Sequence, residues 1–367
     1  MNTIQNNGLM QRWNTVQYEL LPALQADHVA LTPKLEQVIH ALEWSRIEQF
    51  IPSVARWVGR PSLDRGMLAN AFVAKAVLGI STTVGLIDRL SNDNSLKRIC
   101  GFSLIKRLPD ESTFSRAFAE FSLMGLAERC HEFLVKNMLG DRLIGHISRD
   151  GTAIHAREKP LKKVKLNKPS QTVRRGRPKQ SEVREEKVSK VEQQLNKPLN
   201  ILLKELPKEC DRGTKCNAQG YKNSWNGYKL HIDTADCGIP VSAILTSAST
   251  HDSLASIPLA LKTAERVTNC YDLMDAAYCS QTLREHSRSL GHVPLIDHNR
   301  RRGEKIAFTP SEAQRYKERS QAERTNGRLK DQFGANNIRV KGHVKVMSHL
   351  MFGILALTVD QIKRLLT

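Results

Sequence analysis

The feature that most constrains the fold is a change of sequence pattern near Asp141. Between about residues 32 and 140, apolar residues recur every three or four positions, as in LEQVIHALEW and MLANAFVAKAVLGI, which predicts helices. After Asp141, short strand-like runs alternate with helical patterns. This order predicts an α/β protein in which a helical part, residues 1–140, precedes a mixed-sheet part, residues 141–367.

In the second part, aspartates mark the ends of two predicted strands. RLIGHISRD predicts a strand that ends at Asp150 before a tight turn at Gly151, and CYDLMD predicts a strand that ends at Asp275. WNGYKLHIDTADCGIPVSAILTSAST predicts a hairpin that turns at Ala235–Gly238. Asp252 is expected to cap the next helix, with support of a nearby site as the alternative. A helix in CSQTLREHSRSLG and a strand in HVPLID complete the pattern.

A polar, Lys-rich insertion at about residues 158–222 interrupts this part. Within it, Arg175-Gly176-Arg177-Pro178 matches the core of an AT-hook, in which two arginines flank a backbone that fits a narrow A·T minor groove. Arg175 and Arg177 are therefore predicted DNA contacts. Two modes of contact stay open, which are insertion into the minor groove and plain phosphate binding.

The chain is strongly basic. Its 367 residues include 56 Lys and Arg against 37 Asp and Glu, which gives a formal net charge of +19. Such an excess predicts a polyanionic partner, because a basic surface attracts phosphates. Charge alone does not separate an enzyme that acts on DNA from a protein that coats it.

The sequence predicts neither secretion nor a membrane span. The seven cysteines are scattered without a Cys-x-x-Cys pair, which fits free thiols in a reducing cytosol. The N-terminal residues lack the basic-then-apolar order of a signal peptide. The most apolar C-terminal run, Val346–Val359, is too short to cross a bilayer and predicts a buried helix instead.

Four polar residues near the C-terminus follow helical spacing. They are separated by three, four and seven positions and comprise Tyr316, Arg319, Glu323 and Lys330. On a helix their side chains fall within an arc of about 60°. One carboxylate would then lie among two cations and a phenol, which suits a metal ion beside a phosphate backbone. The alternative is a salt-bridged surface helix, which uses Glu and Lys at similar spacings.

This helix has clear end signals in the sequence. Thr309-Pro310-Ser311-Glu312 predicts an N-cap, a proline at the first helical position and a capping-box glutamate. Gly334 predicts the stop. We therefore expect one helix from about residue 310 to residue 332, with Glu323 in its rigid middle.

Three carboxylates from separate elements predict a metal site. Asp150 and Asp275 end predicted strands, at the kind of sheet edge where α/β sites form. Glu323 comes from a helix that could pack beside the same edge. Three such oxygen donors suit two Mg²⁺ ions, which together can activate an attacking oxygen and stabilise a leaving one. The competing candidates are Asp110, Asp233, Asp252, Asp272 and Asp297.

Another candidate DNA contact lies in the helical part. RLPDESTFSRAFAEFSL predicts a capped helix whose buried face is Phe114, Phe118 and Phe121. Arg116 then points outward. A short helix that follows a turn and another helix resembles a helix-turn-helix recognition element, and an ordinary helical bundle is the alternative.

These motifs together resemble the DDE transposases of bacterial insertion sequences. RDGT at Asp150 and DLMDAAY at Asp275 are similar to the two aspartate motifs of that family. The four helical residues match its Y-(2)-R-(3)-E-(6)-K signature at every spacing. SLDRGMLANAFVAKAVLGI and LPDESTFSRAF also resemble the helical N-terminal domain of these transposases, so the resemblance covers about residues 62–365.

The resemblance implies a fold, a mechanism and a set of partners. Residues 141–367 would form an RNase H-like catalytic domain, and residues 1–140 a helical domain that binds the element's ends. Asp150, Asp275 and Glu323 would hold two Mg²⁺ or Mn²⁺ ions for DNA cleavage and for transfer of the freed 3′-OH into target DNA. The residues implied to position the phosphate backbone are Tyr316, Arg319 and Lys330.

The family also implies where and with what the protein works. Its partners would be double-stranded DNA, as terminal inverted repeats and as target, and further copies of the chain, because two ends must be brought together. Its place would be the bacterial cytoplasm, on the nucleoid. Two other functions stay open, which are a DNA-binding regulator derived from a transposase and a metal-dependent nuclease on the same fold.

Overall fold

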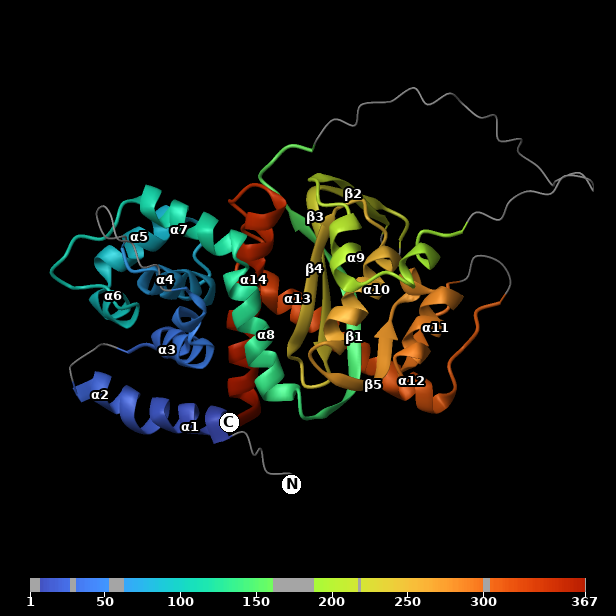
Figure 1. Ribbon diagram of the computed structural model, residues 1–367, viewed down its shortest axis with the longest axis horizontal. Coiled ribbons are helices and arrows are strands. Elements are labelled where there is room, and N and C mark those ends of the chain that lie inside the picture. The colour runs from blue at the N-terminus through green and yellow to red at the C-terminus, as the bar shows by residue number, and fades with distance from the viewer. Residues whose placement is uncertain are drawn as a thin grey trace, which may run out of the picture.

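The computed structural model describes residues 7–26, 31–52, 63–160, 188–216, 219–299 and 304–366. They form a helical body and an α/β body that lie side by side (Figure 1). The helical body contains α1 (Asn7–Thr15), α2 (Leu21–Ala26), α3 (Pro33–Ser45), α4 (Arg65–Val77), α5 (Thr83–Asn92), α6 (Asn94–Ile99), α7 (Glu111–Leu123) and α8 (Leu126–Leu139).

Local sequence explains where several of these helices begin. Thr32 caps α3 by accepting a hydrogen bond from the backbone N–H of Leu35 at 3.3 Å, and Thr82 caps α5 by accepting from that of Gly85 at 2.9 Å. The aromatic face predicted for α7 is confirmed, since its three phenylalanines are buried against the other helices.

Six strands of the described residues form one mixed sheet. They are β1 (Leu143–His155), β2 (Asp211–Cys216), β3 (Lys222–Ala235), β4 (Pro240–Ser247), β5 (Thr268–Met274) and β6 (Val293–Ile296). β1, β3 and β4 pair antiparallel, β2 pairs antiparallel with the start of β3, and β5 and β6 continue the sheet in parallel beyond β1. The helices around the sheet are α9 (Leu199–Glu205), α10 (Asp252–Ala264), α11 (Gln281–Ser289), α12 (Pro310–Tyr316), α13 (Ser320–Gln332) and α14 (His343–Leu366).

Two strand assignments differ from those that the sequence predicted. β1 does not end at Asp150, because the residues beyond it stay paired with β3 and place Gly151 opposite His231. The predicted turn at Gly151 was therefore wrong. In addition, the end of the predicted insertion contains α9 and β2, and β2 extends the sheet along β3. The hairpin between β3 and β4 is confirmed, with Gly238 in its turn at a φ of 80°.

α10 and α13 cover opposite faces of β1. Arg149 points toward α10 and donates to the Ser256 hydroxyl at 3.1 Å, whereas the next residue, Asp150, points toward α13. Arg149 also forms a two-pronged ion pair with Asp233, with N···O distances of 2.7 and 2.8 Å. This buried pair gives the competing candidate Asp233 a structural role on the face away from Asp150.

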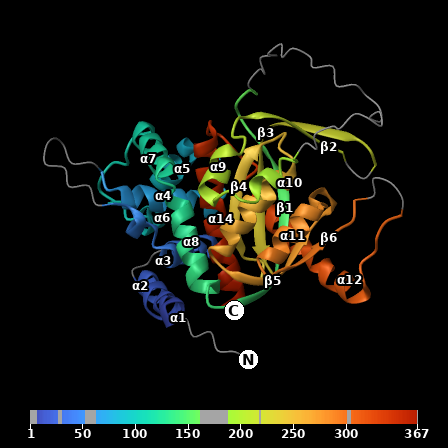
Figure 2. The same cartoon turned by 45° about the vertical axis from the view of Figure 1, so that its right-hand side comes forward.

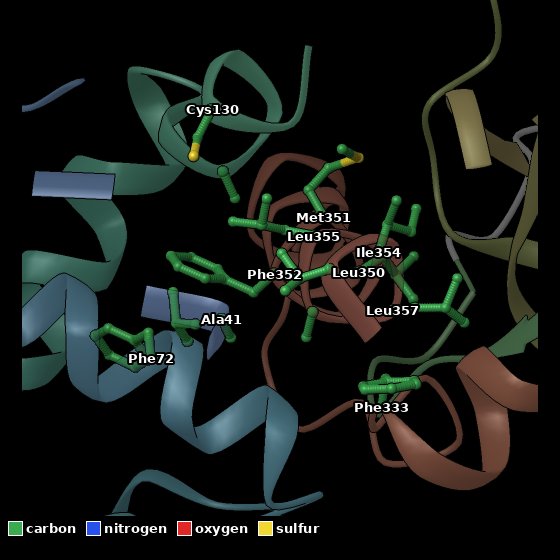
Figure 3. Packing of buried hydrophobic residues seen from close by; sticks show 14 of the residues in the cluster. Ala41, Phe72, Cys130, Phe333, Leu350, Met351, Phe352, Ile354, Leu355 and Leu357 are labelled. Carbon is green, nitrogen blue, oxygen red and sulfur yellow. The ribbon is translucent and has the colours of Figure 1, made fainter. Parts of the chain in front are cut away.

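One helix from far along the sequence lies at the centre of the molecule. α14 packs against α3, α4, α7 and α8 and also against β4 and α13. Figures 1 and 2 both show it between the helical body and the sheet. Phe352 of α14 lies in the core drawn in Figure 3, with its ring centroid 5.9 Å from that of Phe72 in α4. The buried helix predicted near the C-terminus is confirmed.

Candidate active site

The candidate site forms where three separate segments meet. Asp150 lies in the middle of β1, with β3 on one side and β5 on the other. Asp275 directly follows β5. The four residues of the helical signature lie in α12, in the short turn after it and in α13, and α13 packs on β1 and β3.

The side chain of Asp150 is largely shielded from solvent. Its Oδ2 accepts a hydrogen bond from the side-chain amide of Asn326 at 2.9 Å, and its Oδ1 lies 3.8 Å from a guanidinium nitrogen of Arg319. The pKa of Asp150 is raised to about 6, mainly by burial; the charge of Arg319 opposes this shift and the negative charge of Asp275 adds to it. Two carboxylates therefore act on each other here, and a cation placed between them would relieve their repulsion.

Asp275 is fixed by the turn that follows β5. Its side chain accepts a hydrogen bond from the backbone N–H of Ala277 at 2.9 Å and caps a short 3₁₀ turn. Burial raises its pKa, and the charge of Asp252 adds to the effect. The competing candidate Asp272 is buried elsewhere, where it accepts from Asn269 at 3.1 Å and lies 3.1 Å from a ring nitrogen of His292.

The helix that carries the signature begins as predicted but is not continuous. Thr309 and Glu312 form the expected capping box, with Pro310 at the first helical position. A 3₁₀ turn at Lys317–Arg319 then separates α12 from α13, so Glu323 lies in the first turn of α13 and not in the middle of one helix. The change from α-helix to 3₁₀ geometry occurs without a Gly or Pro in the turn. It coincides with tertiary contacts of the helical segments on both sides of it.

The signature residues nevertheless converge on the two aspartates. The hydroxyl of Tyr316 donates to the carbonyl of Met274 at 3.1 Å, directly before Asp275. Arg319 lies between Asp150 and Glu323, and its bond to the Glu323 carboxylate is 2.5 Å long. The Glu323 side chain is 59% exposed, so it is the most accessible of the three predicted carboxylates.

Burial shifts the pKa values of two further signature residues, Tyr316 and Lys330. It raises the pKa of Tyr316 to about 12, which keeps the phenol protonated at neutral pH. It lowers the pKa of Lys330, while the nearby charge of Asp150 acts in the opposite direction. Lys330 is half-buried on the α13 face that turns toward Asp150, so it adds positive charge to the same site.

The donor set suits a divalent metal, although the side chains are not gathered around one point. Within the described ranges, no group of three or more His, Cys, Asp and Glu side chains is close enough together to hold a metal ion. Arg319 supplies the positive charge between Asp150 and Glu323 in this arrangement. Carboxylate oxygens are the ligands that Mg²⁺ and Mn²⁺ prefer, and a cation beside Asp150 and Asp275 would offset the burial and repulsion that raise their pKa values.

Asp252 lies against this site and does not have the role that we expected. The N-cap of α10 is His251, and Asp252 is the first helical residue. Its Oδ1 lies 3.1 Å from the Lys229 amine and 3.6 Å from a ring nitrogen of His231. A methyl group at Gly151 would come within 2.8 Å of the same oxygen, so Asp252 fits against the residue that follows Asp150.

Two residues of this neighbourhood had weak signals in the sequence. Asn326 stands three positions after Glu323 and therefore shares its helix face, which is a local signal for its contact with Asp150. For Lys229, the sequence predicts only which face of its strand it lies on. Its contact with Asp252 depends on how β3 and α10 pack. The remaining competitors lie at other contacts, with Asp297 paired to Lys305 at 2.9 Å and Asp110 at the start of α7.

The other predicted DNA contacts are not brought to this site. Arg116 is exposed on α7, where it donates to the carbonyl of Ser112 in its own helix at 3.2 Å. Arg175 and Arg177 lie outside the described residues. All of these DNA-contact roles stay predictions.

Comparison with known families identifies the class of protein. The family model described as Transposase DDE domain matches residues 148–359, and the model described as Transposase domain (DUF772) matches residues 19–120. The first match covers more than half of the chain, which therefore belongs to the DDE transposases of insertion sequences. No curated protein and no solved structure matches the chain significantly.

This membership confirms the resemblance and the fold class predicted from the sequence. The protein is an insertion-sequence transposase with an RNase H-like mixed sheet after a helical region, its substrate is DNA, and its family generally uses a divalent metal. No helix among the described residues is long and apolar enough to cross a membrane. The division of the chain at residue 140 stays a prediction.

Proposed function

We propose that this transposase cuts DNA at the ends of its element by metal-dependent hydrolysis and joins the freed 3′-OH to target DNA. Asp150, Asp275 and Glu323 are the proposed metal-binding and catalytic residues. The observation that supports this most is the meeting of β1, the end of β5 and the α12–α13 segment, with Arg319 between two of the carboxylates. Segments this far apart in sequence meet here with the donors that the chemistry needs.

The chain's own residues prepare this chemistry. Two Mg²⁺ or Mn²⁺ ions, when bound, would activate the attacking oxygen and stabilise the leaving one. Asp150 and Asp275 are fixed by hydrogen bonds from Asn326 and from the backbone of Ala277, so they form the rigid part of the proposed ligand set. Glu323 is exposed and bound to a side chain alone, so it is the adjustable part.

The signature cations are the proposed contacts for the phosphate backbone. One terminal nitrogen of Arg319 is buried, lies 3.8 Å from Asp150 and has no hydrogen-bond acceptor among the described residues, so this guanidinium keeps an unsatisfied donor beside the carboxylates. Lys330 adds a second positive charge beside Asp150. Tyr316 holds the end of α12 to β5 through Met274 and thereby keeps the cations near Asp275.

The wider assembly follows from the same reaction. The helical region would bind the terminal inverted repeats, with Arg116 of α7 as one contact, and Arg175 and Arg177 of the insertion would add others. A homo-oligomer on DNA is proposed, because two element ends must be held together. We place the protein in the bacterial cytoplasm, on the nucleoid.

The test is cleavage and joining of a labelled duplex that carries the element's ends, with Mg²⁺ or Mn²⁺. We expect strand-transfer product from the wild type and none from Asp150→Ala or Glu323→Gln. Asp331→Asn is a matched control, because it removes an exposed charge from the same helix. Cleavage without joining would instead identify a nuclease, and binding without cleavage a regulator.

A further inference from the structure

A basic cleft lies between the two bodies, apart from the carboxylates. It encloses about 580 Å³ and is called here the Lys75 cleft. Five of its lining residues are cations, and they are Lys75, Arg157, Arg339, Lys341 and Lys345. They come from α4, from the residues that follow β1, from the segment before α14 and from the start of α14. None of the lining residues belongs to the proposed metal site or to the helical signature.

Among the described residues, little negative charge lines this cleft. Glu111 is the one acidic residue among the described residues that line it. Across the described chain, none of the five cations has an ion pair with a carboxylate. Elsewhere on the surface such pairs do form, for example between Lys136 and Glu132 at 2.7 Å. Unpaired cations facing one cavity indicate an anionic ligand.

Lys75 gives the strongest indication. Its side chain is 8% exposed, lies at the inner wall of the cleft and has no hydrogen-bond or ion-pair partner within the described residues. Burial lowers its pKa to about 8. An ammonium that is partly removed from water and has no partner costs folding free energy, so a ligand that supplies negative charge would be bound favourably there. The neighbouring His349 has a pKa lowered to about 4, mainly by burial, and stays neutral.

A helix terminus adds to the same attraction. α5 is ten residues long and begins at the wall of the cleft, where Thr82 and Thr83 line it. The first backbone N–H groups of a helix have no partner within the helix and carry partial positive charge. Thr82 satisfies one of them, the N–H of Gly85, and leaves earlier ones directed outward.

We propose that the Lys75 cleft binds the phosphate backbone of DNA that the transposase holds. Five cations spread over two bodies fit several successive phosphates better than one small anion. Because some lining residues come from α4, α5 and α7 and others from the chain after β1 and the start of α14, one DNA segment bound here contacts both bodies. The inference rests on the proposed function only in taking DNA as the substrate.

The experiment is a DNA-binding titration at several salt concentrations without divalent metal, so that no cleavage occurs. The test variant is Arg339→Gln with Lys345→Gln, two exposed side chains of the cleft. Its matched control is Arg288→Gln with Lys204→Gln, also exposed, on α11 and α9. We expect the cleft variant to bind at least tenfold more weakly and to lose about 1.8 from its salt slope, as two phosphate contacts predict.

Lys75→Met separates a binding role from a structural one. If Lys75 binds DNA, the variant should bind DNA more weakly. In the absence of DNA, the variant should be more resistant to heat at pH 7 than the wild type. Lower stability would show that Lys75 is a structural residue, and an unchanged salt slope in the double variant would overturn the proposal. If the wild-type protein cleaves DNA and the cleft variants bind DNA normally, only the proposed role of the Lys75 cleft is refuted. Absence of DNA binding by the wild type would refute the proposed function as well.

Discussion

Asp150 shows how a side chain at the proposed active site can lower the stability of the fold. It is enclosed by β1 and α13, and its pKa of about 6 lies above the ordinary value of 3.8. The folded protein therefore binds this proton more tightly than the unfolded chain does. The contribution of Asp150 to stability falls as pH rises from about 4 to about 6 and stays unfavourable above that range.

Asp150→Asn should therefore stabilise the metal-free protein at pH 8. An amide keeps a similar shape without the charge, and we expect a gain of about 1 to 3 kcal/mol, because one pKa unit is worth about 1.4 kcal/mol. Urea unfolding with a chelator at pH 8 and pH 5 measures the gain, which should shrink at the lower pH. Asp331→Asn is the exposed control, and an equal gain at both pH values would refute the prediction.

For individual residues, the sequence predicted contacts correctly where the residues are close together in the chain. Helical spacing predicted that Tyr316, Arg319 and Lys330 would share a face, and the structure brings them to the two aspartates. Strand neighbours carry no such local signal. The contact between Lys229 and Asp252 joins β3 to α10, so it depends on tertiary packing that no spacing rule describes.

At the scale of the element, β1 shows why a glycine can be misread. Gly151 followed by Thr resembled a turn, yet the strand continues because its backbone stays paired with β3. The missing side chain serves a close approach instead, since Oδ1 of Asp252 lies only 2.8 Å from where a Cβ would be. The capped start of α12 was predictable because its signals are neighbours in sequence, whereas the 3₁₀ turn before α13 was not.

Gly151→Ala should therefore impair cleavage more than folding or DNA binding. The added methyl group would lie 2.8 Å from Oδ1 of Asp252 and 3.2 Å from Nδ1 of His231, so Asp252 must move. We expect at least a tenfold slower cleavage rate with a DNA dissociation constant within about twofold of wild type. Gly327→Ala is the control, because a Cβ there meets nothing within 4 Å. Normal cleavage by Gly151→Ala would show that the position of Asp252 is unimportant.

The pair of Arg149 and Asp233 fixes the same strand from its other face. Asp233→Ala leaves the buried guanidinium unpaired, which should cost about 3 to 5 kcal/mol. Urea unfolding measures this loss. Asp297→Ala, which breaks an exposed pair with Lys305, should cost about 1 kcal/mol or less. Similar losses for the two variants would contradict the structural role of the buried pair.

For the whole molecule, α14 decides how the two bodies are linked. Because it packs on both, we expect them to unfold together. Phe352→Ala removes a buried ring from this contact and should cost about 3 to 5 kcal/mol. Amide hydrogen exchange, followed separately in α4 and β1, should show the same loss in both. A loss confined to α4 would show that the bodies are independent, and the partly exposed Phe133→Ala serves as the control.

The position of α14 late in the sequence also determines when, during translation, the helical body can be completed. α8 ends at Leu139 and α14 begins at His343, so about 200 residues must be made in between. At roughly 5 to 20 residues per second, the ribosome needs about 10 to 40 seconds for them. Until then Phe72 lacks Phe352, and the Lys75 cleft lacks Lys345. A nascent chain thus acquires the proposed DNA-binding surface only after the proposed catalytic carboxylates have been translated.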